Sequence, residues 1–256
     1  FVPTMFVRML KLPPEVRARY DVSSIRVAVH AAAPCPVTVK RQMIEWWGPV
    51  LHEYYAGTEG NGFVYTDSED WLAHPGTVGK AIVGTLHVVG DDGQEVPTGE
   101  AGTVYFESEA QFSYHNDPDK TAESYLRDGW STLGDVGHLD EDGFLYVVDR
   151  KKDLIITGGL NVYPKEIETE VNALPGVGES AVIGVPHPDF GEGVVAVVVA
   201  QPGATLDPAA MIASLKAGIA NFKVPKHLFV VADLPRNAMG KVQKNLLREQ
   251  HKALFA

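Results

Sequence analysis

The segment Tyr-Ala-Gly-Thr-Glu-Gly at residues 55–60 combines two hydroxyl groups, a carboxylate and two glycines. Carboxylate oxygens are hard ligands that suit Mg²⁺, so Glu59 could hold that ion. The hydroxyl of Thr58 could bond a phosphate or carboxylate oxygen beside it. The alternative is an ordinary glycine-rich loop with a solvated glutamate, and the segment alone does not decide between the two.

Two further segments could present charge to a ligand. In Gly-Asp-Val-Gly, Asp135 lies between glycines, where backbone can approach a ligand closely and a carboxylate can take two ribose hydroxyls. The loop at 235–241 ends in Lys241, a compact positive charge that can meet phosphate or carboxylate oxygens as charge builds in a transition state. A turn-forming aspartate and a solvated surface lysine are the respective alternatives.

A predicted strand–helix–strand unit leads into the first of these segments. Residues 25–31 (IRVAVHA) are rich in β-branched side chains and predict a buried strand. After a proline-rich break, residues 37–48 place apolar side chains at helical spacing and end at a glycine, and residues 51–55 predict a second strand. This order favours a parallel sheet, whose ligands bind beyond the carboxyl ends of the strands. Residues 55–60 lie at such an end.

The rest of the chain contains two regions with different predicted secondary structure. From about residue 77, strands joined by Asp-Gly and Pro-Thr-Gly turns predict a β-rich region, with a short helix at 117–126. Beyond residue 150, helices at 164–176 and 207–220 alternate with apolar strands at 193–201 and 227–235. These elements indicate a separate α+β domain of about 100 residues.

Composition excludes several classes of protein. The chain is 45% hydrophobic and 21% charged, as in soluble globular proteins, and its net charge of −11 argues against a nucleic-acid binder. Cys35 is the only cysteine, which excludes an intrachain disulfide or a cysteine zinc cluster and fits a cytoplasmic location. The sequence contains no run of about 18 apolar residues, so it predicts no transmembrane helix.

Four motifs follow one another along the chain, and their order and spacing together indicate a family more specifically than any single motif does. They are YAGTEG at 55–60, STLGDVG at 131–137, DGFLYVVDRKKDLIITGGLNVYPKEIE at 142–168 and PRNAMGKV at 235–242. Together they resemble the second half of the AMP-forming acyl-CoA synthetases. These enzymes belong to the adenylate-forming superfamily, with firefly luciferase and the adenylation domains of peptide synthetases. The resemblance covers essentially the whole chain.

The resemblance implies a two-step ligase reaction. A carboxylate attacks the α-phosphate of ATP with Mg²⁺ to give an acyl-adenylate and pyrophosphate, and the thiol of coenzyme A then displaces AMP. The implied partners are therefore a carboxylic acid, ATP/AMP, Mg²⁺ and coenzyme A. The alanines at 31–33 leave room for a fatty acyl chain, so we expect a fatty acid, with aryl acids and steroid side chains as alternatives. Dimers are common in the family, which allows a homodimer here.

The resemblance also implies roles for single residues. Lys241 would bridge the substrate carboxylate and the α-phosphate, Thr58 would contact both of these groups, and Glu59 would bind Mg²⁺. Four further residues would bind the nucleoside. Adenine would stack on Tyr55, and Ala32 would belong to the loop that lines the adenine and acyl pockets. Asp135 would accept both ribose hydroxyls, and Arg150 would bond the same sugar. Gly158 and Gly159 would lie beside the path of the pantetheine arm.

The expected architecture has three parts. Residues 1–76 would be the end of a doubly wound α/β subdomain, residues 77–150 a β-rich subdomain, and residues 151–256 a small mobile α+β domain that swings about a hinge at Lys152. A charged hinge residue can stay solvated in both orientations. This fold class is mixed, with α/β and α+β parts.

The departures from the family pattern are also informative. The Ser/Thr/Gly-rich phosphate loop of the family and most of its first subdomain are absent from these 256 residues. We therefore expect the C-terminal half of a longer protein, with little or no adenylation activity on its own. Two alternatives are kept: an adenylating enzyme with another acceptor, such as a carrier protein or the oxygen used by luciferases, and a non-catalytic binding module.

Overall fold

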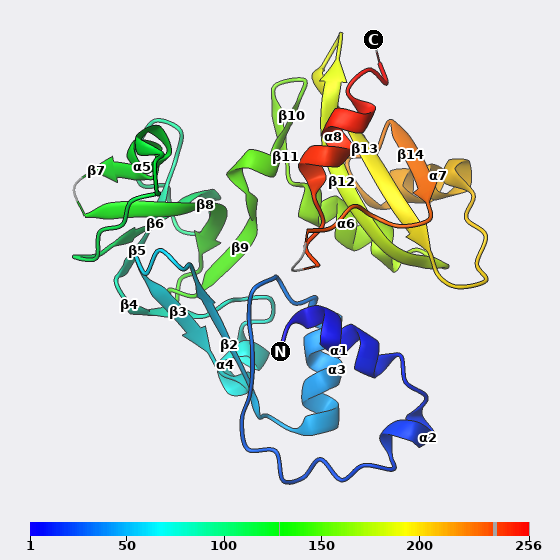
Figure 1. The fold of residues 1–256 in the computed structure, drawn as a ribbon, viewed down its shortest axis with the longest axis horizontal. Coiled ribbons are helices and arrows are strands. Elements are labelled where there is room, and N and C mark those ends of the chain that lie inside the picture. Colours follow the sequence, from blue (N-terminus) through cyan, green and yellow to red (C-terminus); the bar gives the residue numbers. More distant parts are fainter. Residues whose placement is uncertain (128, 238–239, 256) are drawn as a thin grey trace. The chain divides into compact units, whose positions relative to one another are not determined.

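The computed structural model describes residues 1–127, 129–237 and 240–255, and the chain divides into two compact units, Phe1–Val148 and Asp149–Ala256. The first unit holds two β-sheets and the second unit holds one (Figure 1). Helices accompany each unit, so the mixed α/β and α+β fold class expected from the sequence is confirmed. The finer division into three parts stays a prediction. No helix among the described residues is long and apolar enough to cross a bilayer.

The first sheet of the first unit contains the expected strand–helix–strand unit. Its four strands lie side by side in chain order: β1 (Ala28–His30), β2 (Leu51–Ala56), β3 (Phe63–Thr66) and β4 (Lys80–Val83). β1 and β2 are parallel, and α3 (Val37–Trp47) connects them. β1 is shorter than the strand expected at 25–31, because its pairing with β2 extends only from Ala28 to His30.

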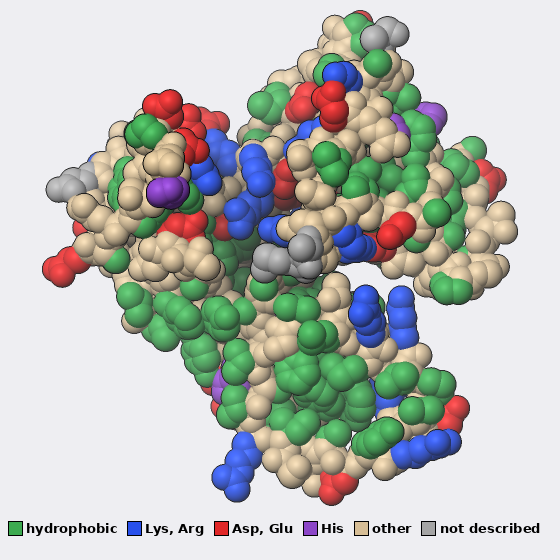
Figure 2. All heavy atoms as spheres, viewed as in Figure 1, with side chains coloured by type: hydrophobic (Ala, Val, Ile, Leu, Met, Phe, Trp, Pro, Cys, Tyr) green, Lys and Arg blue, Asp and Glu red, His purple; other side chains and the backbone are tan. Residues whose placement is uncertain are grey.

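Three helices bury an apolar core against β2. They are α1 (Pro3–Leu10), α3 and α4 (Ser68–Ala73), and Phe6, Met43 and Trp71 from these helices meet Leu51 of β2. The short helix α2 (Pro14–Arg17) follows α1. Hydrophobic side chains also gather on the outer surface over α1 and α3 (Figure 2). This core fixes the start of β2, whose other end leads into residues 55–60.

The second sheet of the first unit supplies the other half of the candidate site. Its members are β5 (Thr85–Val89), β6 (Gly102–Glu107), β7 (Tyr125–Arg127), β8 (Trp130–Leu139) and β9 (Leu145–Arg150). The strand order is β5-β6-β8-β7, and β9 also pairs with β8. The helix expected at 117–126 is α5 (Pro118–Glu123), which Asp117 caps by accepting the N–H of Lys120.

The second unit is one sheet with helices on both faces. Its elements are the 3₁₀ turn η1 (Lys151–Asp153), β10 (Ile155–Thr157), β11 (Leu160–Val162), α6 (Pro164–Ala173), β12 (Val177–His187), β13 (Gly191–Ala200), α7 (Pro208–Gly218), β14 (His227–Val231) and α8 (Lys244–His251). The sheet order is β11-β10-β13-β12, and β14 lies parallel to β13 (Figure 1).

Burial on both faces explains the continuous apolar run of β13. Val194, Ala196 and Val198 belong to the core beneath α6 and α7, whereas Val195 and Val197 belong to the core beneath α8. A strand covered on only one face would alternate apolar and polar side chains. The sheet therefore gives a rigid support to the loops at its edges.

Candidate active site

A hydrogen bond joins two of the motifs singled out from the sequence. The Tyr55 hydroxyl donates to Asp135 Oδ2 at 2.6 Å, across 80 residues of chain. Tyr55 lies at the end of β2 and Asp135 in β8, so each of the two sheets of the first unit contributes one residue. The Tyr55 ring also lies nearly parallel to Phe106, with 6.1 Å between centroids. The first unit thus brings an aromatic ring and a buried carboxylate together.

A bulge in β8 determines where Asp135 points. On β6, Thr103 pairs with Val136 and Tyr105 pairs with Thr132, so residues 133–135 of β8 stand opposite one residue of β6. Gly134 adopts φ +79°, a left-handed conformation that favours glycine. Bulges of this kind re-aim a side chain next to a site. The two glycines seen around Asp135 in the sequence are therefore explained in part by this local geometry.

Thr58 and Glu59 lie in a tight turn directly after β2. Gly60 donates its N–H to the Gly57 carbonyl at 3.2 Å, which closes the turn. The Thr58 hydroxyl reaches Glu59 Oε2 at 3.4 Å. A Cβ at position 57 would lie 2.5 Å from that same oxygen and 2.6 Å from the Leu133 side chain, so a larger residue there would require one or both of these side chains to move. The turn holds the two oxygen-bearing side chains beside each other.

Glu59 has a partner that motif reasoning missed. The Tyr114 hydroxyl donates to Glu59 Oε1 at 2.8 Å, and Lys120 Nζ lies 3.6 Å from the Tyr114 ring centroid. Partial burial opposes ionisation of Glu59, but hydrogen bonds from Tyr114, its own backbone and Thr58, together with the charge of Lys120, lower its pKa below the ordinary value. None of the four motifs singled out from the sequence contains Tyr114, and nothing in the sequence indicated the contact.

The loop after β1 is strained where small side chains were noted. Ala32 adopts φ +73°, and a non-glycine residue in this region of backbone conformation is uncommon. Its side chain is exposed, and the loop lies beyond the carboxyl end of β1, next to the parallel strand β2. Strain of this kind clusters at ligand sites. Ala32 therefore lies beyond the end of β1, while Tyr55 and Glu59 lie at and just beyond the end of the adjacent parallel strand β2.

In the second unit, Arg236 and Asn237 contact the backbone next to Lys241. The backbone N–H of Lys241 donates to Asn237 Oδ1 at 2.9 Å, and Asn237 N–H donates to the Lys241 carbonyl at 3.0 Å. Arg236 donates to the Gly240 carbonyl at 2.8 Å and forms an ion pair with Glu179 of β12. Of the motif at 235–242, residues 238 and 239 lie outside the described residues. The exposed Lys241 side chain is carried by a loop tied to the sheet.

The expected hinge lies between two anchored carboxylates. Asp149 accepts the N–H of Lys165, in the first turn of α6, at 2.8 Å, and Asp153 accepts from Arg248 of α8 at 2.6 Å. Burial raises the pKa of Asp149, against the charge of Lys244 and its backbone hydrogen bonds. Lys152, which lies in η1 between these anchors, is exposed.

Arg150, which was expected to bond the ribose, donates its backbone N–H to Asp149 Oδ1 at 2.8 Å.

Gly158 and Gly159 form the turn of the β10–β11 hairpin, in which Thr157 pairs with Leu160. Both glycines have positive φ, +58° and +79°, as two-residue hairpin turns require. The glycine pair is thus explained by the turn itself. Its contact with a pantetheine arm stays a prediction.

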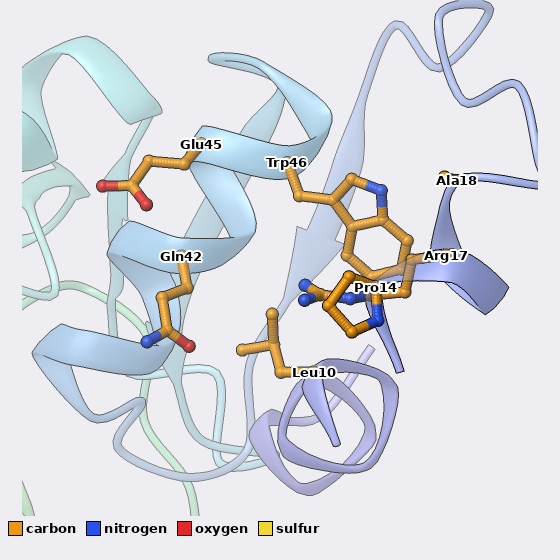
Figure 3. Close-up of a pocket in the computed structure, with 7 residues that line it drawn as sticks. All are labelled: Leu10, Pro14, Arg17, Ala18, Gln42, Glu45 and Trp46. Carbon is orange, nitrogen blue, oxygen red and sulfur yellow. The ribbon is translucent and has the colours of Figure 1, made fainter. Parts of the chain in front are cut away.

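A hollow elsewhere in the first unit contains none of the predicted site residues. It measures about 610 Å³ and lies among α1, α2 and α3, lined by Leu10, Pro14, Arg17, Ala18, Gln42, Glu45 and Trp46 (Figure 3). The Arg17 guanidinium lies 5.3 Å from the Trp46 ring centroid. A hollow by itself therefore does not mark the candidate site, which rests on the strand ends and the motif residues.

The donor set around Glu59 fits a magnesium ion that arrives with its substrate. Among the described residues no group of three or more His, Cys, Asp or Glu side chains could hold a metal by itself. Mg²⁺ usually takes one or two carboxylates and fills its other positions with water and substrate phosphates. The ionised Glu59 beside a Thr58 hydroxyl supplies this hard-oxygen chemistry.

Comparison with known proteins decides the family. The model of the AMP-binding enzymes matches residues 1–113, and the model of the AMP-binding enzyme C-terminal domain matches residues 166–241. The chain belongs to the family of AMP-binding enzymes. The resemblance to adenylate-forming enzymes drawn from the four motifs is thereby confirmed.

The curated relatives that the chain matches are longer than the chain itself. It is 42% identical over 254 residues to the 3-[(3aS,4S,7aS)-7a-methyl-1,5-dioxo-octahydro-1H-inden-4-yl]propanoyl:CoA ligase of Rhodococcus jostii strain RHA1, covering 98% of this chain and 47% of that protein. The chain spans about half the length of the curated relatives it matches.

Two solved structures resemble the chain over nearly all of its length. ATP-bound MatB from Rhodopseudomonas palustris shares 42% identity with a TM-score of 0.87, covering 100% of this chain and 51% of that one. The amide bond synthetase McbA from Marinactinospora thermotolerans shares 32% identity with a TM-score of 0.86, covering 98% and 52%. The fold of the chain is therefore shared with an ATP-bound protein and with an amide bond synthetase.

Proposed function

We propose that the chain is the C-terminal part of an AMP-forming acyl-CoA synthetase, which activates a carboxylic acid with ATP and passes the acyl group to coenzyme A. The observation that carries the proposal is the hydrogen bond between Tyr55 and Asp135, which unites two family motifs 80 residues apart. Its support from sequence is the 42% identity to a named CoA ligase across 98% of this chain.

In this proposal the first unit binds the nucleotide. Adenine stacks on Tyr55 and passes the backbone at Ala32, and Asp135 accepts hydrogen bonds from both ribose hydroxyls. A carboxylate has about four lone-pair sites, so Asp135 can serve Tyr55 and a ribose together. Glu59 would ligate Mg²⁺, which when bound neutralises phosphate charge as the two anions meet, and Thr58 would contact the phosphate and the acid.

The second unit supplies the residues that differ between the two steps. Lys241 brings a positive charge to the substrate carboxylate and the α-phosphate, and Arg150 bonds the ribose. Removing one preorganised charge contact of this kind typically slows a reaction by about 10²–10³. For the second step the unit turns about Lys152, and the turn of Gly158 and Gly159 lies beside the incoming thiol. Asp149 and Asp153 are both anchored to helices of the second unit, α6 and α8, so a turn about Lys152 would have to break the hydrogen bond between Asp149 and Lys165.

The acid is proposed as a class. The alanines at 31–33 favour an acid with a bulky apolar tail, either a fatty acid, an aryl acid or one with a fused ring system. The Rhodococcus relative is named for a propanoyl group on a methylated, fused two-ring skeleton, which supports the last of these.

A second function differs only in the acceptor. McbA is named an amide bond synthetase and matches this chain with a TM-score of 0.86. An amine, or a carrier-protein thiol, could therefore replace coenzyme A in the second step without any change in the nucleotide site.

A panel of acids with the full-length protein tests the proposal. We expect ATP–pyrophosphate exchange with at least one of a fatty, an aryl and a fused-ring acid, and AMP release that needs both that acid and coenzyme A. Exchange with AMP release only on addition of an amine or a carrier protein would favour the second function. Absence of exchange with every acid, while the protein is folded, would overturn both.

A further inference from the structure

A tyrosine outside the four motifs holds the proposed magnesium ligand from one side. The Tyr114 hydroxyl donates to Glu59 Oε1 at 2.8 Å, while the Thr58 hydroxyl approaches Oε2 at 3.4 Å. Both oxygens of the carboxylate are therefore engaged by hydroxyl groups. The first contact spans 55 residues and depends on tertiary structure, whereas the second is made by the preceding residue.

Tyr114 is itself held in place by its surroundings. Its backbone N–H donates to the Thr121 hydroxyl at 2.9 Å, and that hydroxyl donates to the Asp117 carbonyl at 2.9 Å. Lys120, on the same helix α5, places its ammonium 3.6 Å from the Tyr114 ring centroid. A cation over a tyrosine ring is attracted to its face. Helix α5 thus fixes the tyrosine at its backbone and at its ring.

A second tyrosine fixes the chain just before Tyr114. The Tyr125 hydroxyl accepts the N–H of Phe112 at 2.7 Å and donates to the Phe112 carbonyl at 2.9 Å. One side chain therefore occupies both backbone groups of one residue, two positions before Tyr114. The support for Tyr114 is built from β7 and α5 together and does not depend on Glu59.

The shape of the turn at residues 57–60 shows what the support of Tyr114 does for Glu59. At Gly57 a Cβ would lie 2.5 Å from Glu59 Oε2, so the carboxylate folds back over the glycine. A glutamate side chain has several orientations, and an interaction from outside the turn adds to the Thr58 contact in selecting one of them. Tyr114 makes such an interaction from a rigid support.

We propose that Tyr114 is a positioning residue for the first half-reaction: it holds the Glu59 carboxylate in the orientation that takes Mg²⁺, and Lys120 and Thr121 hold Tyr114. This inference rests on the proposed function, because it concerns the metal that accompanies ATP. Residues that orient a metal ligand typically change metal affinity or activity by about 10–100-fold when they are altered.

The test uses Tyr114→Phe in the full-length enzyme, which keeps the ring beneath Lys120 and removes only the hydroxyl. Binding of Mn²⁺, as a stand-in for Mg²⁺, is measured by electron paramagnetic resonance with a non-hydrolysable ATP analogue. We expect Mn²⁺ to bind about 10–100-fold more weakly, and the Mg²⁺ concentration for half-maximal ATP–pyrophosphate exchange to rise in parallel. Thioester formation from a supplied acyl-adenylate and coenzyme A should stay close to that of the unaltered enzyme, since it needs no ATP-bound metal.

Two companion variants sharpen the result. Lys120→Met should weaken Mn²⁺ binding in the same direction but by less, because it loosens the ring and leaves the hydroxyl. Tyr20→Phe, at a tyrosine that is 68% exposed, is the matched control and should change nothing. If Tyr114→Phe does not fold, Lys120→Met alone carries the test, and unchanged Mn²⁺ binding in it would overturn the inference.

The outcomes separate this inference from the function beneath it. Unaltered enzyme that catalyses exchange, with Tyr114→Phe binding Mn²⁺ as tightly, overturns the positioning role and leaves the proposed function standing. Equal loss in both half-reactions of Tyr114→Phe also overturns the role, because a general structural defect would explain it. Unaltered enzyme that shows no exchange with any acid overturns the proposed function and this inference with it.

Discussion

A buried ion pair ties the helix α3 to the strand that leads into the candidate site. Lys40 of α3 is fully buried, Glu53 of β2 is 4% exposed, and Lys40 Nζ lies 2.6 Å from Glu53 Oε2. Burial lowers the pKa of Lys40 and raises that of Glu53, while the attraction of each for the other works the opposite way. Two residues beyond Glu53 the strand reaches Tyr55.

We predict that Lys40→Met destabilises the protein far more than a surface substitution does. Removing one partner leaves an uncompensated buried carboxylate, which typically costs about 3–5 kcal/mol. Glu53→Leu should cost a similar amount, because it leaves a buried ammonium. Replacing both partners by apolar side chains of similar size is often nearly neutral, so the double variant should lose about 2 kcal/mol or less.

Urea unfolding of the four full-length proteins measures these free energies. Tryptophan fluorescence is a suitable signal, because Lys40 Nζ lies 4.9 Å from the Trp71 ring centroid. The surface variant Arg41→Met, at the next position of α3, serves as the control and should change the free energy of unfolding by less than about 0.5 kcal/mol. Single losses below about 1 kcal/mol, or a double variant equal to the sum of the singles, would refute the reasoning.

Two further predictions concern acid stability and the pivot. Burial, followed by the charge of Lys40, lowers the pKa of His30 to about 3. As the pH falls, the His30 side chain is therefore protonated in the unfolded chain before it is protonated in the folded protein. The free energy of unfolding should fall by about 2 kcal/mol between pH 6.5 and 5. Urea unfolding of His30→Gln should show a flatter pH dependence. Lys152→Pro in the full-length enzyme should keep ATP–pyrophosphate exchange and lose thioester formation, because proline locks φ at the pivot; survival of both half-reactions would show that the pivot lies elsewhere.

Much of the fold could be read from local patterns. The helix at 37–48 and the apolar strand at 193–201 were predictable because period and composition are properties of short segments. The long strand β12 (Val177–His187) was not predicted, since Gly178 and Pro186 interrupt its apolar pattern and its length depends on pairing with β13. Local signals therefore identify elements better than they set their limits.

The residues of the candidate site also divide into those with a local sequence signal and those without one. The motif residues were found from the sequence because glycine, carboxylate and lysine stand together within a few positions. Tyr114 was missed because its contact with Glu59 crosses 55 residues and exists only once α5 and β2 are folded. Lys40 was missed because a lysine within an amphipathic pattern normally marks the solvated face of a helix, whereas this lysine is buried. Long-range polar contacts carry no local signature.

The measurement that tests the central claim most directly separates the two half-reactions in the full-length Lys241→Ala enzyme. The account predicts that ATP–pyrophosphate exchange falls by about 10²–10³, because the charge that meets the α-phosphate and the carboxylate is gone. It predicts that thioester formation from a supplied acyl-adenylate and coenzyme A stays within about twofold of the unaltered enzyme, because that step does not need this lysine. Equal loss of both half-reactions, or exchange that survives the substitution, would contradict it.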